Sequence, residues 1–178
     1  MSTPKITLEY FNIAGRAEVA RAAFWIGDIP FEDVRITHEQ FGENKAAGKY
    51  PLGQVPVISV NDGPIIPQSA AIVRYAAQLS GLTPSDPYNA LLVDSYNETV
   101  NDLVLLVAST FRVSAEERQT KREDIAQNAL PKLFKYFESV IQDDKIYLVG
   151  DKISTADLTL LIFVKDWISS GMLDHIPT

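Results

Sequence analysis

The chain of 178 residues contains no cysteine, only two histidines and no long apolar run. Without cysteine there can be no disulfide, thiolate metal ligand or cysteine nucleophile, so a thiol for chemistry must arrive with a ligand. His38 and His175 are far apart in the sequence, which argues against a metal cluster. No apolar stretch approaches the roughly 20 residues needed to cross a bilayer. We therefore expect no metal and no membrane segment.

Positive charge is also scarce. Sixteen Lys and Arg residues face 23 Asp and Glu residues, and the net charge of −7 argues against a nucleic-acid partner. Hydrophobic residues make up 46% of the chain and charged residues 22%, which is typical of a globular protein large enough for one or two domains. Residues 1–5 lead into a strand instead of a signal-peptide core, so we expect a cytoplasmic protein.

Residues 5–80 mix the two-residue period of strands with the wider spacing of helices. Strands are expected near residues 6–10, 33–36, 57–60 and 64–66, the last two joined by the turn Asn61-Asp62-Gly63. A helix should end at Gly27, and another should begin with Ser69 as its N-cap. The polar stretch 37–53 is expected to be an irregular surface segment, with His38 in a loop. This order predicts a small α/β domain.

Beyond residue 81 the pattern changes. The turn-rich stretch 81–87 predicts a linker, and the rest of the chain has helical spacing. Ser114 with Glu117 and Ser154 with Asp157 have the spacing of capping boxes, to which we assign no chemistry. Pro131 should kink or restart its helix. We predict a first domain over 1–81, a linker over 82–88 and an all-helical domain over 89–178.

Tyr10 ends the first predicted strand, directly before a loop and a helix N-terminus. Unpaired N–H groups and a partial positive charge at such a terminus stabilise an anion. The arrangement suits a tyrosine that holds a small anionic reactant. Alone, the arrangement is weak evidence, because most strand tyrosines are half-buried packing residues.

Four motifs occur in order along the chain and together resemble the cytosolic glutathione transferases, most closely the sigma class, whose members include a glutathione-dependent prostaglandin D synthase. The motifs are Tyr10-Phe11-Asn12 with Gly15-Arg16-Ala17-Glu18 and Arg21, Gly53-Gln54-Val55-Pro56-Val57, Gln68-Ser69-Ala70-Ala71-Ile72, and Ala156-Asp157 in the second capping box. The resemblance implies a thioredoxin-like glutathione-binding domain followed by an all-α domain, in a cytoplasmic homodimer that detoxifies hydrophobic electrophiles. It also implies a C-terminus shorter than in relatives, which continue for roughly another helix or two after the position of Pro177, an estimate that rests on the resemblance and not on domain-size statistics.

In this family a tyrosine hydroxyl donates a hydrogen bond to the glutathione sulfur, and Tyr10 matches that position. An unperturbed thiol has a pKa of about 8.5, and lowering it by two units requires about 2.7 kcal/mol. One hydrogen bond to a charged group supplies about 1.5–3 kcal/mol, so a single phenol is sufficient in magnitude. Arg16 matches the arginine that supports this tyrosine.

The resemblance assigns further positions to glutathione. Pro56 matches a cis-proline, which would turn the backbone of Val55 toward the ligand. Gln68 and Ser69 match residues that bind the γ-glutamyl carboxylate at a helix start.

Some of the other matched positions depart from the family pattern, and others have a second interpretation without a role in binding. Lys45 matches a residue that holds the glycine carboxylate, and it can equally be a solvated lysine. Phe41 and Gln54 stand where the sigma class often has tryptophan and lysine, which predicts altered glutathione binding. Asp102 matches an acidic residue that reaches the partner subunit's glutathione, or it is a plain surface carboxylate.

The hydrophobic substrate pocket is expected to include Phe11, Ile13, Ala14, Leu105, Ser109 and Arg112. The leading function is a glutathione S-transferase. One alternative is a glutathione-dependent isomerase of the prostaglandin D synthase type. Another is a non-catalytic binder or structural protein, as among the sigma-like lens crystallins. His175 is expected to have no catalytic role.

Overall fold

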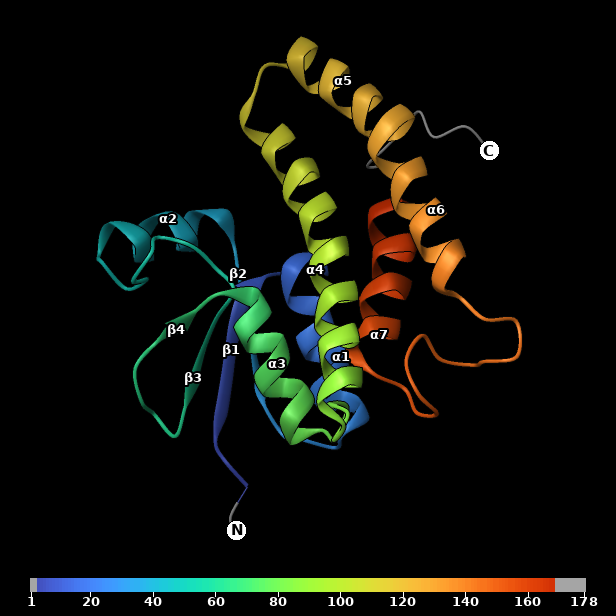
Figure 1. Ribbon diagram of the computed structural model, residues 1–178. Helices are drawn as coiled ribbons and strands as arrows, with labels where there is room; N and C mark the ends of the chain where they lie inside the picture. Colours follow the sequence, from blue (N-terminus) through green and yellow to red (C-terminus); the bar gives the residue numbers. More distant parts are fainter. Residues whose placement is uncertain (1–2, 169–178) are drawn as a thin grey trace. The chain divides into compact units, whose positions relative to one another are not determined.

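A computed structural model describes residues 3–168, apart from the side chain of Trp167. The chain divides into two compact units between Thr83 and Pro84, a point that lies inside the predicted linker (Figure 1). Each unit is described by itself. None of the helices in the described part of the chain combines the length and apolar content that a membrane span requires.

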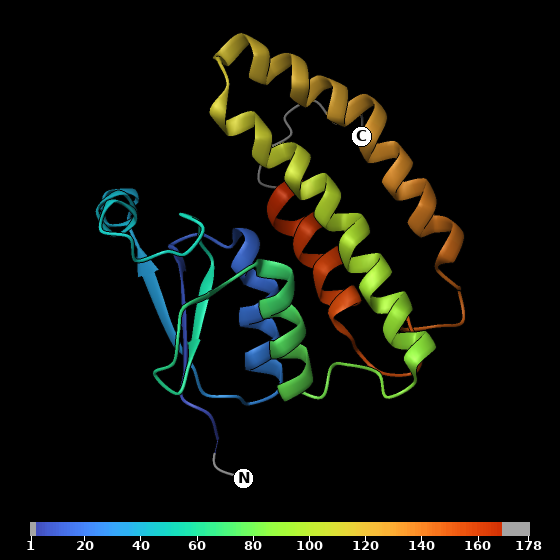
Figure 2. The same ribbon diagram turned by 60° about the vertical axis from the view of Figure 1, so that its left-hand side comes forward.

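The first unit is built on a four-stranded mixed sheet in the order β2-β1-β3-β4. Its strands are β1 (Ile6–Phe11), β2 (Glu32–Ile36), β3 (Val57–Val60) and β4 (Ile66–Pro67). The central strand β1 runs parallel to β2 and antiparallel to β3. Figure 2 shows α1 (Glu18–Ile26) and α3 (Ser69–Leu79) on one face of the sheet and α2 (His38–Ala46) on the other side. This arrangement confirms the predicted α/β fold.

The stretch 37–53 was expected to be irregular, and this expectation is wrong, because it contains α2. The helix begins with a capping box in which Thr37 Oγ1 accepts from the Gln40 N–H at 3.1 Å and Gln40 Oε1 accepts from the Thr37 N–H at 2.8 Å. No residue of α2 is buried, so the sequence has no apolar face to reveal it. His38 is therefore the first residue of a helix instead of a loop residue.

The second unit is helical, as predicted. Its helices are α4 (Pro87–Ser109), a 3-10 turn over Thr110–Arg112, α5 (Ala115–Asp124), α6 (Leu130–Val140) and α7 (Thr155–Ile162). Side chains of α4, α6 and α7 form its core, among them Tyr96, Val100, Leu130 and Phe137. The helix after Ser154 begins with the predicted capping box, and Asp157 also accepts a hydrogen bond from the Leu148 N–H at 2.8 Å.

The predicted disturbance at Pro131 takes the form of a π-helical segment over Ile125–Ala129, directly before α6. Proline has no N–H, and its ring clashes with the carbonyl four residues earlier in a regular helix. A wider turn removes that clash. Helices α5 and α6 are therefore joined by this π-helical segment.

Gly27, at the end of α1, lies against the end of α3. A Cβ at position 27 would be 2.4 Å from Ser80 Cβ and 2.5 Å from Ser80 Cα, so backbone atoms would have to move. We expect Gly27→Ala to lower the free energy of unfolding by about 3 kcal/mol, as overpacking does. Gly42→Ala is the control, because Gly42 lies inside α2 with nothing within 4 Å of the position a Cβ would take. That change should stabilise the protein by about 1 kcal/mol. Denaturant titrations measure the unfolding free energy of both variants. Equal losses of stability in Gly27→Ala and Gly42→Ala would contradict the prediction.

Candidate active site

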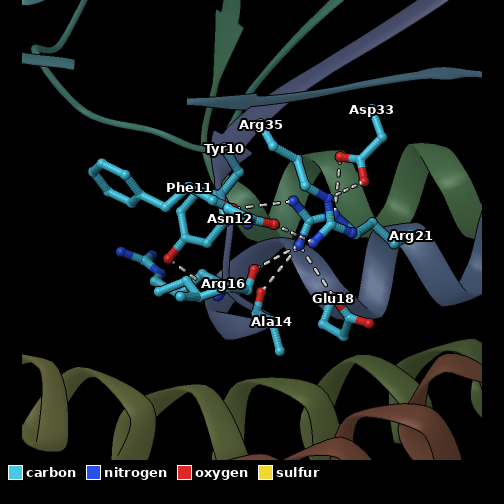
Figure 3. Close-up of polar contacts among 10 residues, drawn as sticks. Tyr10, Phe11, Asn12, Ala14, Arg16, Glu18, Arg21, Asp33 and Arg35 are labelled. Atoms are coloured by element: carbon cyan, nitrogen blue, oxygen red, sulfur yellow. Dashed lines mark hydrogen bonds and ion pairs between the residues drawn. The ribbon is translucent and has the colours of Figure 1, made fainter. Parts of the chain in front are cut away.

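Tyr10 lies near the end of β1, with 7% of its surface exposed. The backbone N–H of Arg16, in the 3-10 turn Gly15–Ala17 that precedes α1, donates to the Tyr10 hydroxyl oxygen at 3.3 Å (Figure 3). Among residues 3–168, no group accepts the hydroxyl proton. The phenol is thus oriented by an acceptor contact and keeps its own proton for donation.

Gly15 lies directly beside this phenol. Its φ is +47°, which L side chains rarely adopt, and a Cβ at position 15 would be 2.8 Å from the Tyr10 hydroxyl oxygen. The glycine therefore permits both the turn and the approach of the Arg16 N–H to Tyr10. Sequence reasoning assigned Gly15 no role, although its place between Tyr10 and the helix start was visible.

The side chain of Arg16 connects the first motif with the third. Its Nη2 donates to Ser69 Oγ at 3.0 Å, and its Nε is buried with no hydrogen-bond partner in the described part of the chain. Ser69 is buried and is the first residue of α3, so the prediction that it caps this helix is wrong. The N-cap residue is the exposed Gln68, which has a φ of +85°. Ser69 is held by Arg16 instead of capping its own helix.

An aromatic group joins β1 to α2. The Phe41 ring is 5.3 Å from the Phe11 ring, edge-on, and 5.5 Å from the Tyr50 ring, stacked. The ammonium of Lys45 lies 5.8 Å from the Phe41 ring centre. Phe11, predicted for the substrate pocket, is half-buried in this group, and the His38 ring packs against it at 4.6 Å. Phe41 and Lys45 therefore share one face of α2.

Tyr50, which follows α2, is connected to Glu9 in β1 by buried polar contacts. Tyr50 donates its hydroxyl proton to Glu9 Oε1 at 2.5 Å, and Lys49 Nζ lies 2.7 Å from Glu9 Oε2. Asn44 donates to the Tyr50 hydroxyl oxygen at 3.1 Å. Burial, reinforced by the hydrogen bond to Glu9, raises the pKa of Tyr50 to about 12. The neutral phenol is the form that the fold stabilises.

This pKa predicts a loss of stability in alkali. An unfolded tyrosine ionises near pH 10, so the contribution of neutral Tyr50 is complete below that pH and is lost as pH rises from about 10 toward about 12. We expect the difference in unfolding free energy between wild type and Tyr50→Phe to shrink by about 2–3 kcal/mol over this range. Urea titrations at pH 9 and near pH 12 measure it. Exposed Tyr88 provides the control variant Tyr88→Phe, and a difference that does not change with pH would contradict the prediction.

The remaining predicted residues of the first unit lie at two places. The Val55–Pro56 bond before β3 is cis, as the resemblance implies, with Pro56 buried, Val55 half-buried and Gln54 exposed. In the loop after β1, Ile13 is exposed and Ala14 is half-buried.

The other predicted residues belong to the second unit. Asp102, Leu105 and Ser109 are exposed at three- and four-residue spacing on α4, and exposed Arg112 follows in the 3-10 turn. Ser109 donates its hydroxyl proton to the Leu106 carbonyl at 2.6 Å. His175 lies outside the described residues. Within the described residues, no three His, Cys, Asp or Glu side chains gather in a way that could hold a metal ion.

Both units match known families. Residues 6–78 match the glutathione S-transferase N-terminal domain, and residues 101–177 match the glutathione S-transferase C-terminal domain. The chain is 36% identical to the hematopoietic prostaglandin D synthase of Gallus gallus, over 97% of this chain and 81% of that protein. It is 31% identical to glutathione S-transferase 3 of Caenorhabditis elegans, over 94% of this chain and 82% of that protein.

Solved structures of similar proteins share the fold of this chain. Prostaglandin synthase D of Nilaparvata lugens superimposes with a TM-score of 0.81 at 33% identity, covering 96% of this chain and 86% of that one. A major nematode-specific transferase of Caenorhabditis elegans gives 0.83 at 26% identity, with 96% and 88% covered. With both domains matched and the fold shared over nearly the whole length, the chain belongs to the glutathione S-transferase family of enzymes.

Proposed function

We propose that Tyr10 donates its hydroxyl proton in a hydrogen bond to the thiolate of bound glutathione, which then attacks a hydrophobic electrophile. The observation that carries this proposal is that the Tyr10 oxygen accepts from the Arg16 N–H, while no group in residues 3–168 accepts the phenol proton. With an aromatic halide, the sulfur forms a bond to carbon and the halide leaves with the bonding electrons. The phenol need not transfer its proton, because it stabilises an anion that has already formed.

Glutathione is proposed to bind along the first domain, residues 1–81. Ser69 and Gln68 are proposed to receive the γ-glutamyl carboxylate at the start of α3, where backbone N–H groups favour an anion. The backbone of Val55, set by Pro56, would pair with the cysteinyl residue like an added strand.

On the other side of the tripeptide, Lys45 is proposed to hold the glycine carboxylate, with Phe41 and Gln54 beside it. The stacking of Phe41 on Tyr50 and the cation–π distance to Lys45 support this placement.

The hydrophobic electrophile is proposed to contact Phe11, Ile13 and Ala14 in the first domain. In the helical domain, residues 89–178, the corresponding contacts are Leu105, Ser109 and Arg112. Aliphatic and aromatic groups with a few polar side chains are typical of such sites.

The finer biological role is proposed from the same resemblance. We infer a sigma-class, cytoplasmic homodimer that detoxifies electrophiles, in which Asp102 reaches the glutathione of the partner subunit. The names of the relatives also favour a second candidate function, a glutathione-dependent isomerase of the prostaglandin D synthase type. Both reactions would use the same Tyr10-bound thiolate.

One product assay tests the proposal. The protein is incubated with glutathione and an aromatic halide, or with a prostaglandin endoperoxide, and the products are identified. A glutathione conjugate supports the transferase, and a rearranged prostaglandin without net loss of glutathione supports the isomerase. Glutathione binding with no product from either substrate would overturn both and favour a non-catalytic binder.

A further inference from the structure

Arg21 lies in α1 and is buried, with 2% of its surface exposed, yet the reaction proposed above gives it no role. Its guanidinium donates to the backbone of the loop that follows β1. Nη1 lies 2.7 Å from the Ile13 carbonyl and 3.4 Å from the Ala14 carbonyl, and Nη2 lies 3.4 Å from the Phe11 carbonyl. Figure 3 shows these contacts converging on one side chain. Hydrogen bonds from Arg21 therefore hold the backbone between Tyr10 and Gly15 in place.

Two carboxylates hold the guanidinium in place. Asp33 Oδ1 lies 3.0 Å from Arg21 Nε, and Glu18 Oε2 lies 3.1 Å from Arg21 Nη1. A buried charge with incomplete partners is costly, whereas here each guanidinium nitrogen has at least one acceptor. The planar fork also fixes the directions of its donors, which a lysine ammonium does not do.

A chain of hydrogen bonds runs from Arg21 through Asp33 and Arg35 back to the loop that follows β1. Asp33 Oδ2 accepts from Arg35 Nε at 2.8 Å, and Arg35 Nη1 donates to Asn12 Oδ1 at 3.1 Å. Arg35 also stands opposite Tyr10 in the register of β1 and β2. The loop is thus held from its carbonyl side by Arg21 and from its Asn12 side chain by Arg35.

Arg21 also lies close to the phenol itself. Its Cζ is 5.8 Å from the centre of the Tyr10 ring, within cation–π range. The loop it holds leads directly to Gly15 and to the Arg16 N–H that meets the Tyr10 hydroxyl. Residues 12–14 form no regular helix or strand, so their backbone has no ladder of its own to fix that position.

We infer that Arg21 is a positioning residue for the thiolate site, because it holds the loop after β1 so that the Arg16 N–H meets the Tyr10 hydroxyl. The inference rests on the proposed role of Tyr10. Arg21 touches neither glutathione nor the reacting atoms in this scheme, and it acts through the backbone.

The test uses Arg21→Lys, which keeps the positive charge and loses the fork. We expect the apparent pKa of the bound glutathione thiol, followed by thiolate absorbance, to rise by about one unit, a tenfold fall in the thiolate-to-thiol ratio. At neutral pH the ionised fraction of a thiol whose pKa rises from about 6.5 to about 7.5 falls by about threefold, so kcat should fall by about threefold and recover at higher pH. The dissociation constant of glutathione should change by less than that. A residue with only a structural role would not move the thiol pKa.

Arg118→Lys is the matched control. The Arg118 guanidinium, in α5 of the second unit, also donates to backbone carbonyls, those of Thr110 at 3.1 Å and Val113 at 3.5 Å, and it has no contact with the loop after β1 among the described residues. We expect less than about a threefold change in thiolate ratio. If Arg21→Lys does not fold, Asp33→Asn keeps the shape of the side chain that anchors Arg21 and should shift the thiol pKa in the same direction, by less. An unchanged thiol pKa in the folded Arg21 or Asp33 variant would overturn the inference.

A readout without glutathione separates this inference from the proposed function. Hydrogen exchange of the Arg16 amide reports its contact with Tyr10 directly, and it should be at least about tenfold faster in Arg21→Lys. If Tyr10→Phe leaves the thiol pKa unchanged, the proposed function fails, while faster exchange in Arg21→Lys would still support positioning. Unchanged exchange together with a normal effect of Tyr10→Phe would overturn the role of Arg21 alone.

Discussion

Tyr10→Phe is expected to lower kcat/KM for conjugation by about 10- to 100-fold at neutral pH. The substitution removes one hydrogen bond to an anionic sulfur, which is worth about 1.5–3 kcal/mol, and each 1.4 kcal/mol is a factor of ten in rate. The Arg16 N–H donates to the same oxygen at 3.3 Å, which polarises the hydroxyl and strengthens its donation. Steady-state rates with glutathione and an aromatic halide measure the loss.

The pH profile shows whether the loss arises from the thiolate. In the wild type the rate should be near its plateau at neutral pH, because the bound thiol is already ionised. In Tyr10→Phe it should keep rising toward the pKa of a free thiol, about 8.5, and the two rates should converge above that pH. Tyr88→Phe, at an exposed position of α4, should behave as the wild type. Equal rates and equal profiles in wild type and Tyr10→Phe would show that Tyr10 is the wrong residue.

Most of the fold could be predicted because its signals are local. The alternation that ends at Tyr10, the turn at Asn61-Asp62-Gly63 and the capping box at Ser154 each depend on neighbouring residues, and the structure contains all three elements. Helix α2 was missed because it has no buried face, and only the spacing of Thr37 and Gln40 marks its start. A search for capping pairs without apolar periodicity would have found it.

The candidate site was less predictable, because its contacts join distant parts of the sequence. Arg16 and Ser69 are 53 residues apart, and Ser69 was expected to cap its own helix instead of receiving a guanidinium. The role of Arg21 as the centre of a loop depends on Asp33 on another strand. Residue type and spacing placed these side chains in motifs, whereas only the folded backbone shows which of them meet.

Gly15→Ala is expected to lower kcat/KM by nearly as much as Tyr10→Phe, about tenfold or more. The new Cβ would be 2.8 Å from the Tyr10 hydroxyl oxygen and 3.0 Å from Tyr10 Cε1, so the phenol or the Arg16 N–H must move. A φ of +47° also costs an L residue about 1–2 kcal/mol. Conjugation rates and the pH profile of the bound thiol measure the functional part, and denaturant titration measures the cost in stability.

Two further variants separate displacement of the phenol from backbone strain. Gly81 has a φ of +69° with nothing within 4 Å of the position a Cβ would take, so Gly81→Ala should lose stability without loss of rate. In the double variant Tyr10→Phe with Gly15→Ala, the hydroxyl that the new Cβ displaces is already gone. The two losses in transition-state stabilisation should therefore not add. Additive losses would mean that Gly15 acts on catalysis by a route that does not involve the Tyr10 hydroxyl.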